Sequence, residues 1–212
     1  MRKKAVIIGN SIVAGYPWGK GKSFPGIVRR ALKGELAEIP QPAFAKNIGF
    51  DVINKGVNGD TTGGILDRFS EDVLKQKPDM VFFMTGTNDF IYREATPDEA
   101  FSNLELMAGM LDSAAATAVY ITPIPVDTDK AEYMWMAGMG ISYAAVNRDI
   151  EELARLMRES GRPCVDLTRT FSDFIEVLGD ADLAYLDGIH PTPGGQMFIA
   201  KQIVDFLEAH HL

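Results

Sequence analysis

Short apolar runs recur along this chain and strongly limit the folds open to it. Residues 5–8, 81–84 and 118–121 are rich in Val, Ile and Phe, and each run is followed by Gly, Asn, Thr or Pro. Runs of this length and composition predict strands that are buried on both faces. Residues 50–53 and 163–167 are weaker candidates, because they include a charged residue or a proline.

The segments between these runs carry apolar residues at helical spacing. Two helix starts are explicit, because Thr96, Pro97 and Glu99 form a capping-box pattern and Thr192-Pro193 begins the last helix in the same way. Strands that alternate with helices predict a three-layer α/β/α fold with a five-stranded parallel sheet. The apolar helix positions are Ile65, Phe69 and Val73; Ala100, Leu104, Met107 and Leu111; Ile150, Leu153 and Met157; and Met197, Ala200, Val204 and Leu207.

Composition limits the domain organisation and the partners. The chain has 212 residues, 46% of them hydrophobic, and no internal repeat or linker, so we expect one domain over residues 1–212. A net charge of -8 without a dense basic patch argues against nucleic acid and anionic membranes as partners.

The single cysteine, Cys164, excludes an intrachain disulfide and is expected to be a buried apolar residue. The run at residues 5–8 is too short for a signal peptide or a membrane span, so a soluble, cytoplasmic protein is expected.

Polar residues follow the predicted strands. They occur at residues 10–11, 58–61 and 86–89, and a further polar loop, residues 187–191, precedes the final helix. In open parallel sheets the loops at the carboxyl ends of the strands converge, and helix N-termini point their N–H groups there. We therefore expect these four loops to form the functional site.

Histidine narrows the chemistry further. The chain has three histidines, and His210 and His211 lie next to the C-terminus, where fraying makes a positioned role unfavourable. His190 is then the internal candidate for a general base, with Asp187 three residues earlier to accept a hydrogen bond from its ring. Ser11 is the serine best placed to be a nucleophile activated by His190. Each of these loops taken alone is typical of an ordinary turn or helix cap, and only their joint arrangement favours catalysis.

The motifs "GNS", "NGDT", "GTND" and "DGIHP", in this order from Gly9 to Pro191, resemble the four sequence blocks of the SGNH, or GDSL-like, hydrolase family. The resemblance implies a flavodoxin-like fold in which Ser11 is the nucleophile, His190 the base and Asp187 the residue that orients it. It also implies an oxyanion hole made by the backbone N–H groups of Ser11 and Gly59 and by the side-chain amide of Asn88. Asn10 departs from the family pattern, which usually has aspartate at this position.

Two other motifs do not support a different activity. "GKGKS", residues 19–23, lacks the first glycine of a phosphate-binding loop and does not directly follow a strand. Ser11 is not in a Gly-x-Ser-x-Gly elbow, because Val13 occupies the position of the second glycine. No cluster of His, Cys and carboxylate residues has metal-ligand spacing, so neither a metal nor a cofactor is expected.

The sequence therefore predicts a serine esterase that hydrolyses carboxylic esters, chiefly short acyl or acetyl esters, including those on carbohydrates. A small-molecule ester is the expected partner, and the oligomeric state is left open. Two alternatives are a thioesterase or lysophospholipase with the same triad, and a non-catalytic ligand-binding module on the same fold. The candidate residues for a substrate pocket are Asn10, Trp18, Met134 and Trp135, with Tyr16, Tyr133 and Met136 as further candidates. The alternative for the aromatic and methionine residues is packing in the core or between helices.

Overall fold

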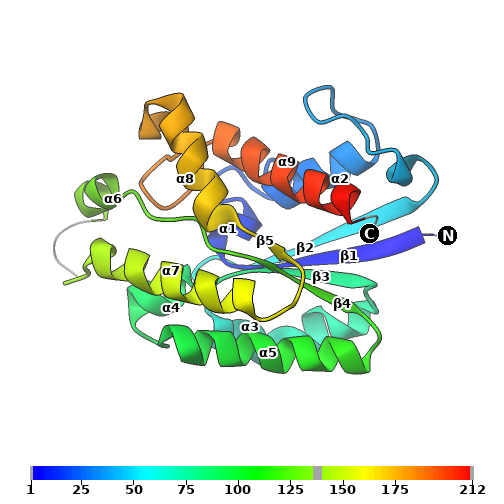
Figure 1. Cartoon of the computed structure of the whole chain (residues 1–212), viewed down its shortest axis with the longest axis horizontal. Helices are drawn as coiled ribbons and strands as arrows, with labels where there is room; N and C mark the ends of the chain where they lie inside the picture. Colours follow the sequence, from blue (N-terminus) through cyan, green and yellow to red (C-terminus); the bar gives the residue numbers. More distant parts are fainter. Residues whose placement is uncertain (1, 136–139, 211–212) are drawn as a thin grey trace.

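A five-stranded parallel sheet forms the centre of the molecule (Figure 1). The computed structural model describes residues 2–135 and 140–210. The strands lie in the order β2-β1-β3-β4-β5, which confirms the predicted α/β fold and its flavodoxin-like strand order. The strands are β1 (Arg2–Gly9), β2 (Gly49–Gly56), β3 (Met80–Met84), β4 (Thr117–Ile121) and β5 (Cys164–Val165).

The last strand is shorter than predicted. It has only two residues, because Asp166 caps a helix that begins at Leu167. The helices are α1 (Ser11–Ala14), α2 (Phe24–Leu32), α3 (Thr62–Asp72), α4 (Thr87–Tyr92), α5 (Pro97–Ser113), α6 (Thr128–Met134), α7 (Tyr143–Glu159), α8 (Leu167–Leu178) and α9 (Pro193–Ala209), with 3₁₀ turns η1 (Phe44–Lys46), η2 (Leu74–Gln76) and η3 (Ala181–Leu183).

Four helices were predicted from apolar spacing, and all four are present as α3, α5, α7 and α9. The predicted capping box is formed, since the Thr96 hydroxyl accepts a hydrogen bond from the Glu99 N–H and the Glu99 carboxylate accepts one from the Thr96 N–H. Thr192 caps α9 as expected. The helices α2 and α8 were not predicted, and Ser23 of the "GKGKS" segment is the N-cap of α2.

Two apolar layers fill the space between the sheet and its helices. Successive residues of β1 point to opposite faces, so Ile7 packs beneath α2, α8 and α9, whereas Val6 and Ile8 pack against α3, α5 and α7 (Figure 1). Burial on both faces explains why the central strands are continuous apolar runs. Cys164 is half-buried at the edge strand rather than fully buried, and desolvation raises the pKa of its thiol to about 12.

The strand order brings three loops together at one edge of the sheet. The chain leaves β1 toward β2 and later crosses back to β3 on the other side, so β1 lies at the point where the order reverses. Gly9 at the end of β1 pairs with Gly56 of β2 and with Met84 of β3, which brings the three strand ends level. A Cβ at Gly56 would lie 2.2 Å from the backbone nitrogen of Ala14, so glycine here lets α1 pack directly on the strand ends.

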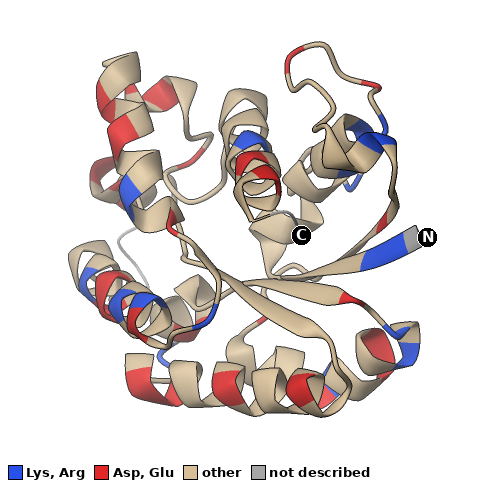
Figure 2. Cartoon of the chain, turned by 45° about the vertical axis from the view of Figure 1, so that its right-hand side comes forward, with Lys and Arg blue, Asp and Glu red and all other residues tan. Residues whose placement is uncertain are grey.

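Charged residues lie mainly on the outer helices and loops, and the middle of the sheet carries few of them (Figure 2). Among the described residues, no helix combines the length and the apolar composition that crossing a membrane requires.

Candidate active site

Ser11, His190 and Asp187 form a continuous hydrogen-bonded chain at the carboxyl edge of the sheet. The Ser11 Oγ lies 2.8 Å from His190 Nε2, and His190 Nδ1 lies 2.8 Å from Asp187 Oδ2. All three residues are buried. Their catalytic roles stay predictions, but the geometry is that of a nucleophile, a base and an acid that orients the base.

Asn10 places Ser11 at the start of α1. The side-chain oxygen of Asn10 accepts a hydrogen bond of 3.1 Å from the Ile12 N–H and so caps this four-residue helix. This role needs one acceptor oxygen and no charge, which explains how asparagine serves where the family usually has aspartate. Asn10 is not among the residues that line the cavity, so the expectation that it belongs to the substrate pocket is corrected.

The two oxygens of Asp187 have separate tasks. Oδ1 accepts hydrogen bonds from the backbone N–H groups of Ile189 (3.0 Å) and His190 (2.7 Å), whereas Oδ2 accepts the His190 ring. Burial alone would raise the pKa of the Asp187 carboxyl, but these hydrogen bonds outweigh it and hold the pKa below its ordinary value. The carboxylate therefore stays ionised and keeps the proton of His190 on Nδ1, which leaves Nε2 free to accept the proton of Ser11.

Gly188 and Trp18 fix the position of the histidine loop. Gly188 has φ of 86°, and a Cβ there would lie 2.5 Å from the backbone nitrogen of Ala131, so α6 packs directly on this loop. The indole N–H of Trp18 donates a 3.2 Å hydrogen bond to the carbonyl of Pro191. Trp18 thus supports the loop from outside the cavity, and the expectation that it lines the substrate pocket is also corrected.

Residues with available hydrogen-bond donors line the same cavity as the Ser11 hydroxyl. Asn88 Nδ2 donates one N–H to the carbonyl of Asp60 at 2.9 Å, which orients the amide and leaves its second N–H available. Among the described residues, neither the N–H of Ser11 nor that of Gly59 donates a hydrogen bond. Ser11, Gly59 and Asn88 all line one cavity, so these donors can face an oxyanion there.

The cavity has a volume of about 340 Å³ and a largely aromatic and aliphatic wall. Tyr16 and Trp135 flank the His190 ring, with ring centroids 4.7 Å and 5.9 Å from it. The residues that line the cavity are Ser11, Tyr16, Asn58, Gly59, Asn88, Ile91, Tyr92, Trp135, Ile141, Tyr143, Ile189 and His190.

The pocket residues expected on α6 are only partly right. Trp135, which ends this helix, turns toward His190 and lines the cavity. Met134 is 50% exposed and Tyr133 is 82% exposed, and neither lines it. Successive helical side chains point about 100° apart, so one member of this run faces the cavity while its neighbours face solvent. Met136 lies outside the described residues.

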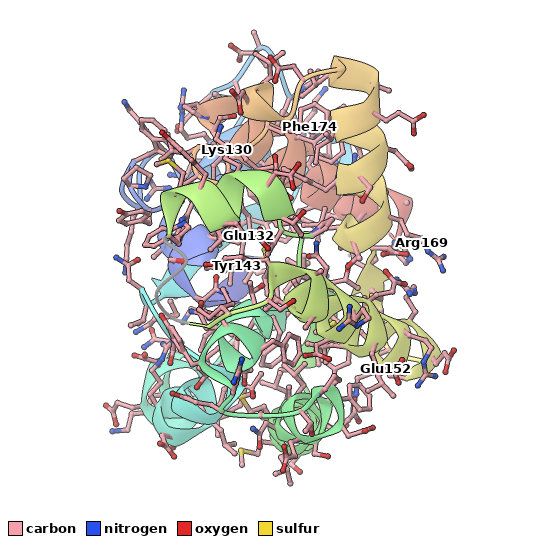
Figure 3. The ribbon with its side chains drawn as sticks, turned by 90° about the vertical axis from the view of Figure 1, so that its left-hand side faces the viewer. Lys130, Glu132, Tyr143, Glu152, Arg169 and Phe174 are labelled. Carbon is pink, nitrogen blue, oxygen red and sulfur yellow. The ribbon has the colours of Figure 1, made fainter. Side chains whose placement is uncertain are left out.

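Several lining residues were missed by the sequence analysis. Ile91 and Tyr92 follow Asn88 by one helical turn, and this spacing was a usable signal. Tyr143 had no such signal. It is the first residue of α7 and lies beside α6, the helix that carries Lys130 and Glu132 (Figure 3). Burial, and then the nearby carboxylates of Asp187 and Glu132, raise the pKa of the Tyr143 hydroxyl, so this group is a neutral donor in the wall.

Both the sequence and the fold are similar to those of known proteins. The model of the GDSL-like Lipase/Acylhydrolase family matches residues 7–197. The chain is 24% identical to an acetylxylan esterase of Geobacillus stearothermophilus, over 94% of this chain and 91% of that protein. It is 27% identical to an arylesterase of Vibrio mimicus, over 98% of this chain and 90% of that protein. The fold matches the crystal structure of the lipase/acylhydrolase from Enterococcus faecalis with a TM-score of 0.74 at 24% identity, over 98% of this chain and 96% of that one.

Proposed function

The chain belongs to the GDSL-like lipase/acylhydrolase family, and from that premise we propose that it is a serine esterase that hydrolyses small carboxylic esters through an acyl-enzyme. The observation that carries the proposal is the hydrogen-bonded chain Ser11–His190–Asp187, which opens into the cavity that Gly59 and Asn88 also line. An intact triad with adjacent oxyanion donors supports catalysis over a ligand-binding module without activity.

The first half of the reaction acylates Ser11. As the Ser11 Oγ bonds to the ester carbonyl carbon, its proton passes to His190 Nε2 and the carbonyl electron pair moves onto oxygen. The N–H groups of Ser11 and Gly59 and the amide of Asn88 donate to this oxyanion. When the C–O bond to the alcohol breaks, His190 returns the proton to the leaving alkoxide and the acyl group stays on Ser11.

The second half releases the acid by the same groups. Water attacks the acyl carbon and gives its proton to His190, and the same donors hold the second oxyanion. Collapse of this intermediate breaks the bond to Ser11, whose oxygen recovers the proton from His190. The products are the free alcohol and the carboxylic acid, and the enzyme is unchanged.

Small neutral esters fit the cavity best. Its volume of about 340 Å³ is near the lower end of the range for ligand pockets, and its wall is mainly apolar. No lysine or arginine occurs among the described residues that line it, so the phosphates of a coenzyme A thioester or a lysophospholipid would find no cationic partner there. The relatives named acetylxylan esterase and arylesterase support acetyl and aryl esters as the first substrates to test.

A panel of chromogenic esters tests the proposal. We expect the wild type to hydrolyse p-nitrophenyl acetate and butyrate faster than the octanoate, and to turn over acetylated sugars in preference to coenzyme A thioesters or lysophospholipids. If no ester is hydrolysed and an organophosphonate probe leaves Ser11 unlabelled, the chain is a binding module and the proposal is wrong.

Removing the amide of Asn88 is expected to lower kcat by roughly a hundred- to a thousand-fold, equivalent to about 3 kcal/mol of transition-state stabilisation. Asn88→Ala has no side-chain amide to donate to the oxyanion, whereas substrate binding in the apolar part of the cavity is retained. Saturation kinetics with p-nitrophenyl acetate should therefore show a lower kcat with little change in KM. A kcat equal to that of the wild type would remove Asn88 from the oxyanion hole.

Trimming the Trp135 side chain is expected to relax chain-length selectivity. Trp135→Ala opens the wall beside His190, so the kcat/KM ratio of octanoate to acetate should rise roughly tenfold, the scale of a methylene-sized change in an apolar pocket. Tyr133→Ala is the matched control, since this neighbouring aromatic is 82% exposed and lies outside the cavity. An equal change of selectivity in both variants would show that Trp135 does not bound the substrate.

A further inference from the structure

Asp89 is a buried carboxylate that the proposed reaction does not use. It is 1% exposed and lies directly after Asn88 in α4. No ion pair among residues 2–135 and 140–210 includes Asp89, so no cation there compensates its charge. The Asp89 carboxylate instead accepts hydrogen bonds from Thr62. The Thr62 backbone nitrogen lies 3.0 Å from Oδ1 and 3.1 Å from Oδ2, and the Thr62 hydroxyl donates to Oδ1 at 2.5 Å.

Keeping this carboxylate buried is costly. Burial raises the pKa of the Asp89 carboxyl to about 6, the hydrogen bonds from Thr62 oppose that rise, and the negative charge of Glu94 adds to it. A buried charge without a cation destabilises the fold. Destabilising groups that are retained next to a site are candidates for a functional role.

The contact with Thr62 joins the two segments that carry oxyanion donors, the loop of Gly59 and the helix α4. Thr62 begins α3 and follows the loop of Gly59, whereas Asp89 follows Asn88. On the far side, the Asn103 amide donates a 3.0 Å hydrogen bond to the Thr62 hydroxyl, so the single proton of that hydroxyl is directed to Asp89. Within the described residues, two other polar contacts join the same two segments, since the Asn88 amide donates to the Asp60 carbonyl and the Thr61 hydroxyl donates to Glu94 at 3.1 Å. Of these links, the one made by Asp89 is buried and involves a carboxylate that accepts from both the N–H and the hydroxyl of Thr62.

We propose that Asp89 is a positioning residue for ester hydrolysis, whose carboxylate holds the start of α3 against α4 and so sets the spacing of the Gly59 and Asn88 donors. The inference rests on the proposed function. Thr62 presents an N–H and an O–H to the same side chain, and a carboxylate can accept from both with either oxygen. An asparagine with its oxygen at the position of Oδ1 still accepts from Thr62, but it carries no charge and places an N–H₂ group where Oδ2 accepts from the Thr62 N–H, which weakens the link without changing the shape.

The first test is Asp89→Asn. Because a misplacement of about 1 Å in a catalytic group can cost up to a hundred-fold, we expect kcat for p-nitrophenyl acetate to fall roughly ten- to a hundred-fold, with KM nearly unchanged. The melting temperature should stay level or rise, because the variant no longer buries a charge. Asp166→Asn is the matched control: Asp166 caps α8 and pairs with Arg158 away from the cavity, so this exchange should lower the melting temperature and leave kcat unchanged.

Two further variants test the route of the effect. Thr62→Val keeps the side-chain shape but removes the hydroxyl that donates to Asp89, so kcat should fall here too with KM unchanged. In an Asn88→Ala background, Asp89→Asn should cost a smaller factor in kcat than in the wild type, because one of the donors it positions is already gone. A purely structural role predicts the same factor in both backgrounds.

Each outcome decides the inference. It is overturned if Asp89→Asn keeps the kcat of the wild type. It is also overturned if Asp89→Asn lowers the melting temperature and lowers kcat by the same factor in the wild-type and Asn88→Ala backgrounds. These results would leave the proposed function intact, provided that the wild type hydrolyses the ester and Ser11→Ala does not. A wild type without ester turnover would overturn the proposed function and this inference together.

Discussion

Replacing Ser11 with alanine is expected to lower kcat for ester hydrolysis by roughly a million-fold, the scale of a nucleophile knockout in a serine triad. The Ser11 Oγ lies 2.8 Å from His190 Nε2 and is the atom that would carry the acyl group. Without it no acyl-enzyme forms, and the remaining rate comes from water in a cavity that still holds the oxyanion donors. The measurement is the rate of p-nitrophenyl acetate hydrolysis by the two purified proteins, with labelling of each by an organophosphonate probe.

Ser23→Ala provides the matched control. Ser23 is buried, caps α2 and lies outside the cavity, so its loss should lower the free energy of unfolding by about 1 kcal/mol and leave kcat and labelling unchanged. Full esterase activity in Ser11→Ala would contradict the mechanism, because it would show that the Ser11 hydroxyl is not the nucleophile.

Exchanging Asp187 for asparagine is expected to lower kcat by roughly ten-thousand-fold, as in other Ser-His-Asp triads. The two backbone N–H groups of Ile189 and His190 would keep the asparagine oxygen at the position of Oδ1, so its N–H₂ group would face the histidine ring. His190 would then accept at Nδ1 and carry its proton on Nε2, where it cannot take the proton of Ser11. The fold should be retained, because the side-chain oxygen still accepts the hydrogen bonds from these two backbone N–H groups.

Asp187→Ala separates the two tasks of this side chain. It removes the acceptor for both backbone N–H groups as well as the partner of the ring, so it should lower the melting temperature more than Asp187→Asn does. Activity assays and thermal melts of both variants check this expectation. A kcat for Asp187→Asn within tenfold of the wild type would mean that Asp187 does not set the tautomer of His190.

Much of the fold could be predicted from local patterns. The central strands could be predicted because residues buried on both faces of a sheet form continuous apolar runs, as at Ile7 in β1 and Phe82 in β3. The capping box at Thr96 and the cap at Thr192 are formed because their hydrogen bonds join residues only three apart. The helix α8 was missed, and the strand predicted at residues 163–167 includes its N-cap, Asp166, and its first residue, Leu167.

The sequence alone also determined which loops would meet. The carboxyl ends of neighbouring parallel strands lie at one edge, so the loops that carry Ser11, Gly59 and Asn88 converge there, and the family resemblance indicated which residues of these loops to expect in the site. The single internal histidine, paired with Asp187, completed the set. Only the tertiary structure decided which side chains form the wall of the cavity. Trp18 and Met134 were expected there but face elsewhere, whereas Tyr92 and Tyr143 line it. The wall depends on how α4, α6 and α7 are rotated as they pack against the rest of the fold, and so does the link between Asp89 and Thr62 on α4 and α3. The physical reason is that a helix rotates its side chains by about 100° per residue, so small differences in packing decide which of them reach the site.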